Sequence, residues 1–480
     1  MSDNKRTICL LNDSFPPTID GVANVVLNYA RIIEKNHAHV MVATPNVPGT
    51  DDSIYDFPVV RYPSIDTRDL IGYVAGYPFS PETAHMAEKE HVGLLHTHCP
   101  MSSAILAKQL AESMDLPLVM TWHTKYDIDI ANAIRSKLMQ EAALQALLHN
   151  VNACDEIWTV SKGAGENLRS LGYEGEYIVM PNGVDLPHGT ADDKTVSEVT
   201  GGFDLPRGIP CYLFVGRMMW YKGLRIILDA LAKLKERGND FRMVFVGGGG
   251  DFDEVRSYAN ELALYDKLIF TGAISDRDQL KAWYTRADLF LFPSTFDTNG
   301  LVVREAAASD TAAVIVAGSC AAEGVTDGRN GFLIDENADS LASKLTELSG
   351  HPDTVKNTGI HAGSELYISW DDAVAKAYER YNVVTDNYKR GVYGRKDPLT
   401  GSWMQSQGEL MQILGGVSAA GRTILEGAEK IRHEAVRTLE EKSLERVEEL
   451  TQSIADAKAG LTDSIRKTGE EIWEHLERYL

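Results

Sequence analysis

The sequence predicts two α/β domains, each a parallel sheet with helices on both faces, followed by a helical extension. Short apolar runs of strand length alternate with amphipathic helical segments along residues 7–390, a pattern typical of parallel sheets. The chain of 480 residues is also too long for one ordinary hydrophobic core, so at least two domains are expected.

The first domain is expected to cover residues 1–190. It opens with a buried strand at 7–11, a loop ending in Gly21, a helix at about 22–35 and a strand at 39–44, which together form one βαβ unit. Further strands are predicted at 92–96, 118–121 and 156–160, with helices from residue 102 and at 136–149. Ligands of such sheets bind beyond the carboxyl ends of the strands. The residues at or just past such ends are Gly21, His96, His98 and His123.

The second domain is expected to cover residues 191–390 and to repeat this architecture. Its boundary is placed in the polar stretch 186–206, which is poor in large apolar residues. A helix at 223–237 is predicted after the first strand, and a closing helix at 371–388. The predicted strands are 211–215, 241–246, 268–271, 287–292 and 313–316.

A linker at 391–407 leads to the predicted amphipathic helical extension at 408–480. Its apolar residues recur at a spacing nearer the 11-residue repeat than the strict heptad. Two interpretations stay open. The extension packs on its own domain or on a second subunit, giving a homo-oligomer, or it lies on a membrane surface. Its polar face is mixed and net acidic rather than rich in Lys and Arg, which argues against the membrane-surface interpretation.

Composition limits the classes of function. The formal net charge of −22 opposes nucleic-acid binding, which depends on neutralising phosphates, and also purely electrostatic docking on an anionic membrane. The five cysteines are scattered without a CxxC or Cys/His cluster, which argues for a reducing compartment and against a zinc site. With no apolar run of membrane-spanning length and no signal-peptide pattern, a soluble cytoplasmic protein is expected.

The stretch 292–305 carries the clearest candidate site. It begins where a buried strand ends, contains the turn signal Asn299-Gly300 and continues into a helix from Leu301. The first N–H groups of a helix lack intrahelical partners and can bind a phosphate. Asp297 and Glu305 flank that position, where their carboxylates could accept hydrogen bonds from sugar hydroxyls. The alternative is a loop acid and an ordinary surface glutamate.

Two cations are placed to face the same position. Arg217 and Lys222 follow the first strand of the second domain and could neutralise a pyrophosphate leaving group, although surface cations fit the spacing equally well. Other chemistries find less support. The glycines at 247–250 fail the dinucleotide pattern, because Phe252 stands at the third glycine position, and the GxSxG motif of hydrolases is absent.

Five motifs in consistent order resemble family 4 of the retaining glycosyltransferases, whose GT-B fold has two Rossmann-like domains facing a cleft. The resemblance covers residues 7–390. Within the family, residues 121–126 together with 16–22 look most like bacterial diacylglycerol glucosyltransferases, with lipid mannosyltransferases as near neighbours. The matching motifs are residues 16–22, 181–185, 215–217 with 222–223, 297–305 and 323–332.

The resemblance implies roles for individual residues. Gly21 would let the first-domain loop approach the donor diphosphate, which Arg217 and Lys222 would bind and stabilise as it leaves. Glu305 would bind the ribose and Asp297 the donor sugar, with His123 beside the transferred sugar. No enzyme nucleophile, metal or cofactor is then needed. The backbone N–H groups that would receive phosphate and sugar oxygens are those of Asn299, Gly300, Leu301 and Val302.

The chain departs from the family pattern at several positions. Asp297 stands where the family usually has glutamate, and Tyr221 replaces a glutamate before the lysine. The loop at 317–323 lacks the customary glycine pair, and Asp310 replaces another customary glycine. These changes bear most directly on which sugar the donor carries.

The resulting hypothesis is a retaining, metal-independent glycosyltransferase that moves a hexose, glucose from UDP-glucose, onto a lipid such as diacylglycerol. It would be cytoplasmic, or peripheral on the inner face of the membrane. One alternative keeps the chemistry but uses GDP-mannose, or a soluble or polysaccharide acceptor. Another class of protein stays open as well, an inactive subunit that binds a nucleotide sugar and serves assembly.

Overall fold

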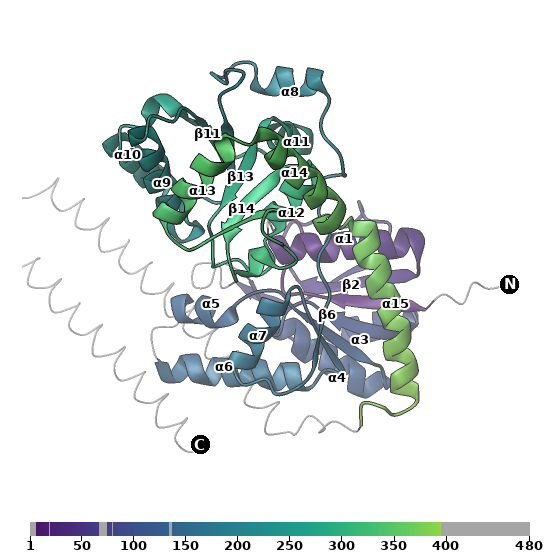
Figure 1. Ribbon diagram of the computed structural model, residues 1–480. Coiled ribbons are helices and arrows are strands. Elements are labelled where there is room, and N and C mark those ends of the chain that lie inside the picture. Colours follow the sequence, from purple (N-terminus) through teal and green to yellow (C-terminus); the bar gives the residue numbers. More distant parts are fainter. Residues whose placement is uncertain (1–5, 19, 67–73, 79, 134–136, 395–480) are drawn as a thin grey trace, which may run out of the picture. The chain divides into compact units, whose positions relative to one another are not determined.

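The computed structural model describes residues 6–18, 20–66, 74–78, 80–133 and 137–394 (Figure 1). The chain divides into a compact unit at residues 1–404 and a second unit at 405–480. The predicted helical extension at 408–480 and most of the predicted linker at 391–407 therefore lie outside the described residues.

The first domain contains a parallel seven-stranded sheet in the order β3-β2-β1-β6-β7-β8-β9. A short antiparallel pair, β4 (Ser64–Asp66) and β5 (Val74–Gly76), accompanies it. The strands are β1 (Thr7–Leu11), β2 (His39–Pro45), β3 (Val59–Tyr62), β6 (Val92–Thr97), β7 (Leu118–Trp122), β8 (Glu156–Thr159) and β9 (Tyr177–Val179). The helices are α1 (Gly21–Asn36), α3 (Pro81–Lys89), α4 (Ser102–Met114), α5 (Tyr126–Ala133), α6 (Lys137–Asn152) and α7 (Lys162–Ser170).

The second domain contains a parallel six-stranded sheet in the order β12-β11-β10-β13-β14-β15. Its strands are β10 (Cys211–Val215), β11 (Arg242–Val246), β12 (Leu268–Gly272), β13 (Leu289–Phe292), β14 (Ala312–Val316) and β15 (Phe332–Ile334). Its helices are α8 (Asp193–Thr200), α9 (Leu224–Glu236), α10 (Phe252–Glu261), α11 (Arg277–Arg286), α12 (Leu301–Ala308), α13 (Ala338–Ser349) and α14 (Pro352–Leu366), with 3₁₀ turns at Trp220–Lys222, Tyr265–Lys267 and Cys320–Ala322.

These sheets confirm the predicted fold class, and every strand predicted from an apolar run is present. Both sheets have the strand order 3-2-1-4-5-6 that defines a doubly wound fold, with one further edge strand in the first domain. The sequence interpretation did not include the strands β3, β9 and β15 or the β4–β5 pair. Four of these five strands have only three residues each, too few for a periodicity to be recognised.

Alternate residues of β1 face opposite sides of the first sheet. Ile8 and Leu10 join a core with α1, whereas Cys9 and Leu11 join a core with α4 and α7. All four are fully buried, because helices cover both faces of the sheet. This double coverage explains why the strand is apolar at every position instead of alternating.

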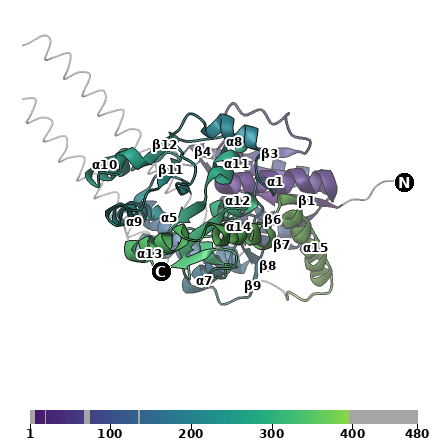
Figure 2. The same cartoon turned by 45° about the horizontal axis from the view of Figure 1, so that its top comes forward.

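The last described helix, α15 (Trp370–Lys389), belongs to the core of the first domain. Its residues Val374, Ala377 and Tyr381 are fully buried together with Ile8 and Leu10 of β1. Figures 1 and 2 show it beside α1. The predicted range 191–390 assigned this helix to the second domain, and the packing corrects that assignment. The sequence shows that a helix closes the chain, but not which sheet its apolar face covers.

The chain therefore crosses between the domains twice, and the two crossings are adjacent. Val184 forms a parallel bridge with Ser369, and its N–H donates to Ile368 O at 3.1 Å. Beside them Gly183 approaches the second crossing closely, since a Cβ at Gly183 would lie 2.5 Å from Trp370 Cα. Glycine is required at that contact because any side chain would displace the backbone of the other crossing.

Candidate functional site

The loop after β13 lies at the point where the strand order of the second sheet reverses, between β10 and β13. Such a switch point is where ligands of doubly wound sheets bind. Gly300 ends the loop with φ +58° and precedes the first residue of α12. A Cβ at Gly300 would also lie 2.7 Å from Ala321 Cα, so glycine satisfies both the left-handed backbone and the close packing.

The helix start carries unpaired backbone donors. The N–H groups of Val303 and Arg304 donate to Gly300 O, and no side chain caps α12. Within the described part of the chain, the N–H groups of Asn299, Gly300, Leu301 and Val302 make no hydrogen bond. The structure therefore brings the four predicted donors together in one turn, where the positive end of the helix dipole favours an anion.

Lys222 and Asp297 form a direct ion pair. Lys222 Nζ lies 2.6 Å from Asp297 Oδ1, and Ser294 Oγ donates to Asp297 Oδ2 at 2.7 Å. The lysine side chain is 11% exposed and that of the aspartate 21%. The pair fixes the ammonium group to the loop that leads into α12.

Close backbone packing places Lys222 there. The lysine ends the 3₁₀ turn 220–222, and Gly223 follows with φ +78°. A Cβ at Gly223 would lie 2.2 Å from Pro293 O, so only glycine lets this turn lie against the loop after β13. Arg217, on the exit from β10, is exposed, and its side chain makes no hydrogen bond or ion pair with the described residues, while its backbone O accepts from Met219 N at 2.9 Å. Because β10 and β13 are neighbours, both predicted cations leave the sheet at the same edge.

Glu305 is nearly buried on the second turn of α12. Tyr284 OH donates to Glu305 Oε2 at 3.1 Å, and Arg277 Nη1 lies 3.2 Å from Glu305 Oε1. The glutamate side chain is 12% exposed, and this burial raises the pKa of its carboxyl group. Arg277 and the tyrosine hydroxyl oppose that shift by stabilising the charged form. Both carboxylate oxygens are thus held in defined directions.

His123 follows β7 in the first domain and contacts the loop of the second. Its backbone O accepts from Thr298 Oγ1 at 2.9 Å. Its ring stacks on that of His98, and His98 Nδ1 lies 3.0 Å from His123 Nε2. Burial lowers the pKa of His123 to about 3, so the imidazole is neutral at physiological pH.

Gly21 is the first residue of α1, and Asp20 caps that helix by accepting from Ala23 N at 3.3 Å. A Cβ at Gly21 would meet nothing within 4 Å, so the space in front of it is open. No hydrogen bond among the described residues joins Gly21 to the loop after β13. Gly21 is thus a predicted site residue that no hydrogen bond in the described ranges joins to the other predicted site residues.

The sequence interpretation missed several residues that join the domains at this site. The carboxylate of Glu323 accepts from Lys162 N at 2.7 Å and from Gly163 N at 2.5 Å, and so caps α7 of the first domain. Ser161 Oγ donates to Thr298 O, and Lys125 Nζ lies 3.4 Å from Thr295 O. Ser161 before a helix is a recognisable capping signal. Its partner in the other domain has no signal in sequence spacing.

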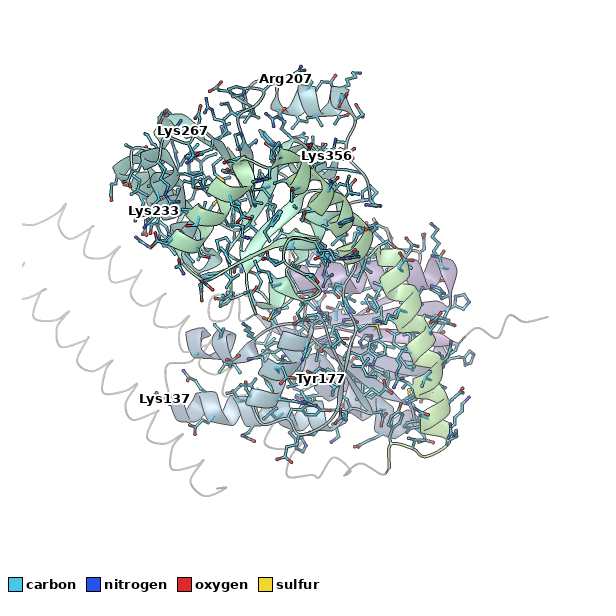
Figure 3. All side chains as sticks on the ribbon, viewed as in Figure 1. Lys137, Tyr177, Arg207, Lys233, Lys267 and Lys356 are labelled. Carbon is cyan, nitrogen blue, oxygen red and sulfur yellow. The ribbon has the colours of Figure 1, made fainter. Side chains whose placement is uncertain are left out.

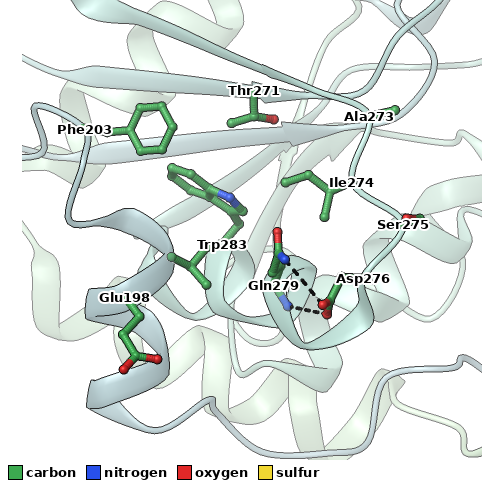
Figure 4. Close-up of a pocket in the computed structure, with 10 residues that line it drawn as sticks. Glu198, Phe203, Thr271, Ala273, Ile274, Ser275, Asp276, Gln279 and Trp283 are labelled. Carbon is green, nitrogen blue, oxygen red and sulfur yellow. Dashed lines mark hydrogen bonds between the residues drawn. The ribbon is translucent and has the colours of Figure 1, made fainter.

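Two cavities lie at the carboxyl edge of the second sheet. One of about 380 Å³ adjoins the loop after β13 and is lined by Lys125, Thr295, Ser319, Cys320 and Glu336, among others. The other, of about 560 Å³, lies between α8 and α11 beyond the edge strand β12, with Phe203 and Trp283 side by side on its wall (Figure 4). Only the smaller cavity borders the candidate site.

The described residues contain neither a metal-binding cluster nor a membrane-spanning helix. In these ranges, no group of three or more His, Cys, Asp or Glu side chains is arranged to hold a metal ion. Likewise, none of the described helices combines the length and the apolar character needed to cross a bilayer.

Two family models match the chain and together cover well over half of it. The model for glycosyltransferase family 4 matches residues 19–187, and the model for glycosyl transferases group 1 matches residues 203–362. Each match contains most of one of the two sheets described above.

Individual relatives are distant but extensive. Alpha-monoglucosyldiacylglycerol synthase of Streptococcus pneumoniae is 23% identical over 396 residues, covering 80% of this chain and 87% of that protein. GDP-mannose-dependent alpha-mannosyltransferase of Corynebacterium glutamicum is 24% identical over 336 residues, covering 68% and 76%. The solved structure of HepE from Anabaena in complex with UDP matches with a TM-score of 0.64 and 18% identity, covering 78% and 100%.

Three findings agree on the family and the fold. The chain has two doubly wound sheets with switch points, a family model matches each of them, and the similar solved structures have the GT-B fold. The chain belongs to family 4 of the glycosyltransferases, with the GT-B fold, and is a hexosyltransferase.

Proposed function

We propose that this protein is a retaining, metal-independent glycosyltransferase that transfers glucose from UDP-glucose to a lipid acceptor such as diacylglycerol. The observation that carries the proposal is the helix start at 299–302, with its unpaired N–H groups beside Lys222. This arrangement suits the diphosphate of a sugar nucleotide. The lipid acceptor is supported by the likeness to a protein named as a glucosyldiacylglycerol synthase.

The residues divide the chemical work. Arg217 and Lys222 stabilise the negative charge that develops on the departing diphosphate, while the N–H groups of the helix start bind its oxygens. Glu305 accepts hydrogen bonds from the ribose hydroxyls. His123, neutral in its buried position, contacts the transferred sugar as a hydrogen-bonding group. Asp297 binds a sugar hydroxyl once the diphosphate has drawn Lys222 away.

Retention of configuration follows from attack on the same face as the leaving group. The bond between the anomeric carbon and the donor phosphate oxygen breaks as the bond to the acceptor hydroxyl oxygen forms. The acceptor proton passes to the departing phosphate oxygen. No enzyme nucleophile is required in this scheme, and no metal ion, because the charge is met by Arg217, Lys222 and backbone N–H groups.

A second donor has specific support. One relative is named as a GDP-mannose-dependent mannosyltransferase, and Asp297 is one methylene shorter than the usual glutamate at a position assigned to the sugar. The donor screen therefore includes GDP-mannose as well as UDP-glucose, and soluble and polysaccharide acceptors as well as lipids. An inactive subunit that binds a nucleotide sugar is a further outcome of the same experiment.

The test is a donor screen. The full chain is incubated with UDP- and GDP-sugars, with and without diacylglycerol vesicles, and the released nucleoside diphosphate and the glycolipid product are measured. UDP-glucose turnover that depends on the vesicles, unchanged by EDTA and giving the α-linked product, is expected. Binding without turnover would identify the inactive subunit, and turnover with GDP-mannose the second donor.

The membrane side of the proposal needs its own measurement. Peripheral binding is tested by flotation with liposomes containing diacylglycerol, for the full chain and for a chain ending at residue 394. We expect the full chain to float. If neither chain floats, the bilayer acceptor is contradicted, and a soluble or polysaccharide acceptor is the remaining alternative.

A further inference from the structure

Arg277 bridges two carboxylates from distant parts of the chain. Its Nη1 lies 3.2 Å from Glu305 Oε1 on α12, and its Nη2 lies 2.6 Å from Asp185 Oδ2. The guanidinium is planar and presents its N–H groups in a fixed fork, so one arginine can hold two carboxylates in a defined relative position. None of the motifs in the sequence marks Arg277.

Asp185 belongs to the first crossing between the domains. Its Oδ1 accepts from Trp370 Nε1 at 2.7 Å, and Trp370 is in the second crossing. The same oxygen accepts from Asn28 Nδ2 of α1 at 3.2 Å. One carboxylate therefore contacts both crossings, a helix of the first domain and, through Arg277, the second domain.

Arg277 and Asp185 also affect the pKa of the Glu305 carboxyl group, which burial raises. Asp185 raises the pKa of the Glu305 carboxyl group by like-charge repulsion, while Arg277 lowers it. The Arg277 side chain is 46% exposed and that of Asp185 33%, so solvent screens the pair and its energy alone is modest. The main effect of the bridge is therefore geometric, since it fixes where Glu305 points.

We propose that Arg277 is a positioning residue that couples Glu305 to the connection between the domains through Asp185. The nucleotide bound at Glu305 and the arrangement of the two crossings are then energetically linked, although Asp185 does not contact the nucleotide. This inference rests on the proposed function, because it requires that Glu305 binds a nucleoside diphosphate.

The test measures nucleotide affinity in variants that break each half of the bridge. Dissociation constants for UDP and for GDP are determined by titration calorimetry for the wild-type full chain and for Asp185→Asn, Arg277→Lys and Arg277→Gln. Asp185→Asn keeps the acceptor for Trp370 but loses the charge that holds Arg277. We expect it to raise the dissociation constant about fivefold or more, the usual scale of coupling between sites.

The remaining variants separate coupling from local charge. Arg277→Lys keeps a cation beside Glu305 but cannot hold both carboxylates, so it should resemble Asp185→Asn. Arg277→Gln also removes the cation beside Glu305, so it should bind nucleotide more weakly than either of these variants. The double variant with Asp185→Asn should show no further loss of nucleotide affinity. Arg329→Gln, which breaks an exposed pair with Glu365, is the matched control and should bind as the wild type does.

The outcomes distinguish a failure of the coupling through Asp185 from a failure of the proposed function. If the wild-type chain binds nucleotide and folded Asp185→Asn binds it equally well, the coupling is refuted while the proposed function stands. The same holds if Arg277→Lys has wild-type affinity. If the wild-type chain binds neither UDP nor GDP, the proposed function fails and the inference fails with it.

Discussion

At the scale of single residues, the pair Lys222–Asp297 explains how a largely buried cation is held beside the loop after β13. The ammonium is largely buried and would lose hydration without a partner. Asp297 supplies that partner, and Ser294 holds the aspartate in turn. In the proposed function, the donor diphosphate would replace Asp297 as the anionic partner of Lys222.

Removing either of two predicted donor contacts is expected to abolish most turnover. Lys222→Ala removes the cation at the leaving group and Glu305→Ala removes the ribose acceptor, so each should lower the rate by about 100-fold or more. Turnover is measured with the donor identified by the screen. Lys233→Ala is the matched control, because Lys233 of α9, labelled in Figure 3, pairs with Asp339 of α13 on the surface. Wild-type rates in Lys222→Ala and Glu305→Ala would refute the site.

The buried histidines make stability depend on pH. Burial lowers the pKa of His123 to about 3 and those of His96 and His98 well below the ordinary value. Above about pH 6.5 all three are neutral in the folded and the unfolded chain, so they do not affect the pH slope. Below that pH only the unfolded chain takes up the protons, and stability falls as the pH falls.

Each such histidine contributes up to about 1.4 kcal/mol per pH unit to this loss. We expect His123→Gln to reduce the pH slope of the unfolding free energy between pH 6 and pH 4 by about that amount. Denaturant unfolding at several pH values measures it. An equal slope in wild type and His123→Gln would show that His123 titrates normally.

At the scale of elements, Glu323 caps a helix that belongs to the other domain. Its two oxygens accept from the first two N–H groups of α7, a position where negative charge is also favoured by the helix dipole. The loss of a helix cap costs about 1 kcal/mol. This contact stabilises the helix and the association of the two domains at the same time.

We therefore expect Glu323→Ala to lower the unfolding free energy of the chain by about 1 kcal/mol, and Glu323→Gln by less, because an acceptor oxygen remains. Thermal and denaturant unfolding provide the measurement. The control is Glu347→Ala, which breaks an exposed pair with Lys344 within α13. Equal losses in Glu323→Ala and Glu347→Ala would mean that the cap contributes nothing.

Elements and motifs were predictable because they depend on neighbouring residues. The apolar runs at β1 and β10 and the turn at Asn299-Gly300 carry local signals, and the structure contains them as predicted. Arg277 and Glu323 were not predictable, since each acts on a partner that is distant in sequence. The choice of sheet for α15 also depends on packing alone, because its apolar stripe suits either domain.

At the scale of the whole molecule, the first domain is incomplete without the end of the described chain. Val374 and Tyr381 of α15 fill its core, and Tyr381 OH lies 2.6 Å from His96 Nδ1. Burying a large side chain contributes about 1.5–3 kcal/mol, so losing several would remove an amount comparable with the roughly 5–15 kcal/mol net stability of a domain.

A chain that ends after residue 368 is accordingly expected to lose the fold of its first domain, whereas a chain ending after residue 394 should keep both domains and its nucleotide affinity. Circular dichroism, gel filtration and UDP titration compare the two. The longer chain serves as the control for truncation itself. Cooperative unfolding of the shorter chain at the same temperature would contradict the role assigned to α15.

The two adjacent crossings have a consequence for the order in which the protein is made. A ribosome releases the strands of the first domain early, but α15 emerges only after the entire second domain. At typical speeds of synthesis the intervening 180 or so residues take roughly ten seconds or more. During that time the sheet face bearing Ile8, Leu10 and Val42 has no cover from α15. Until then α1 covers that face without α15, so the first domain, although it is made first, can complete its core only after the second domain has been synthesised.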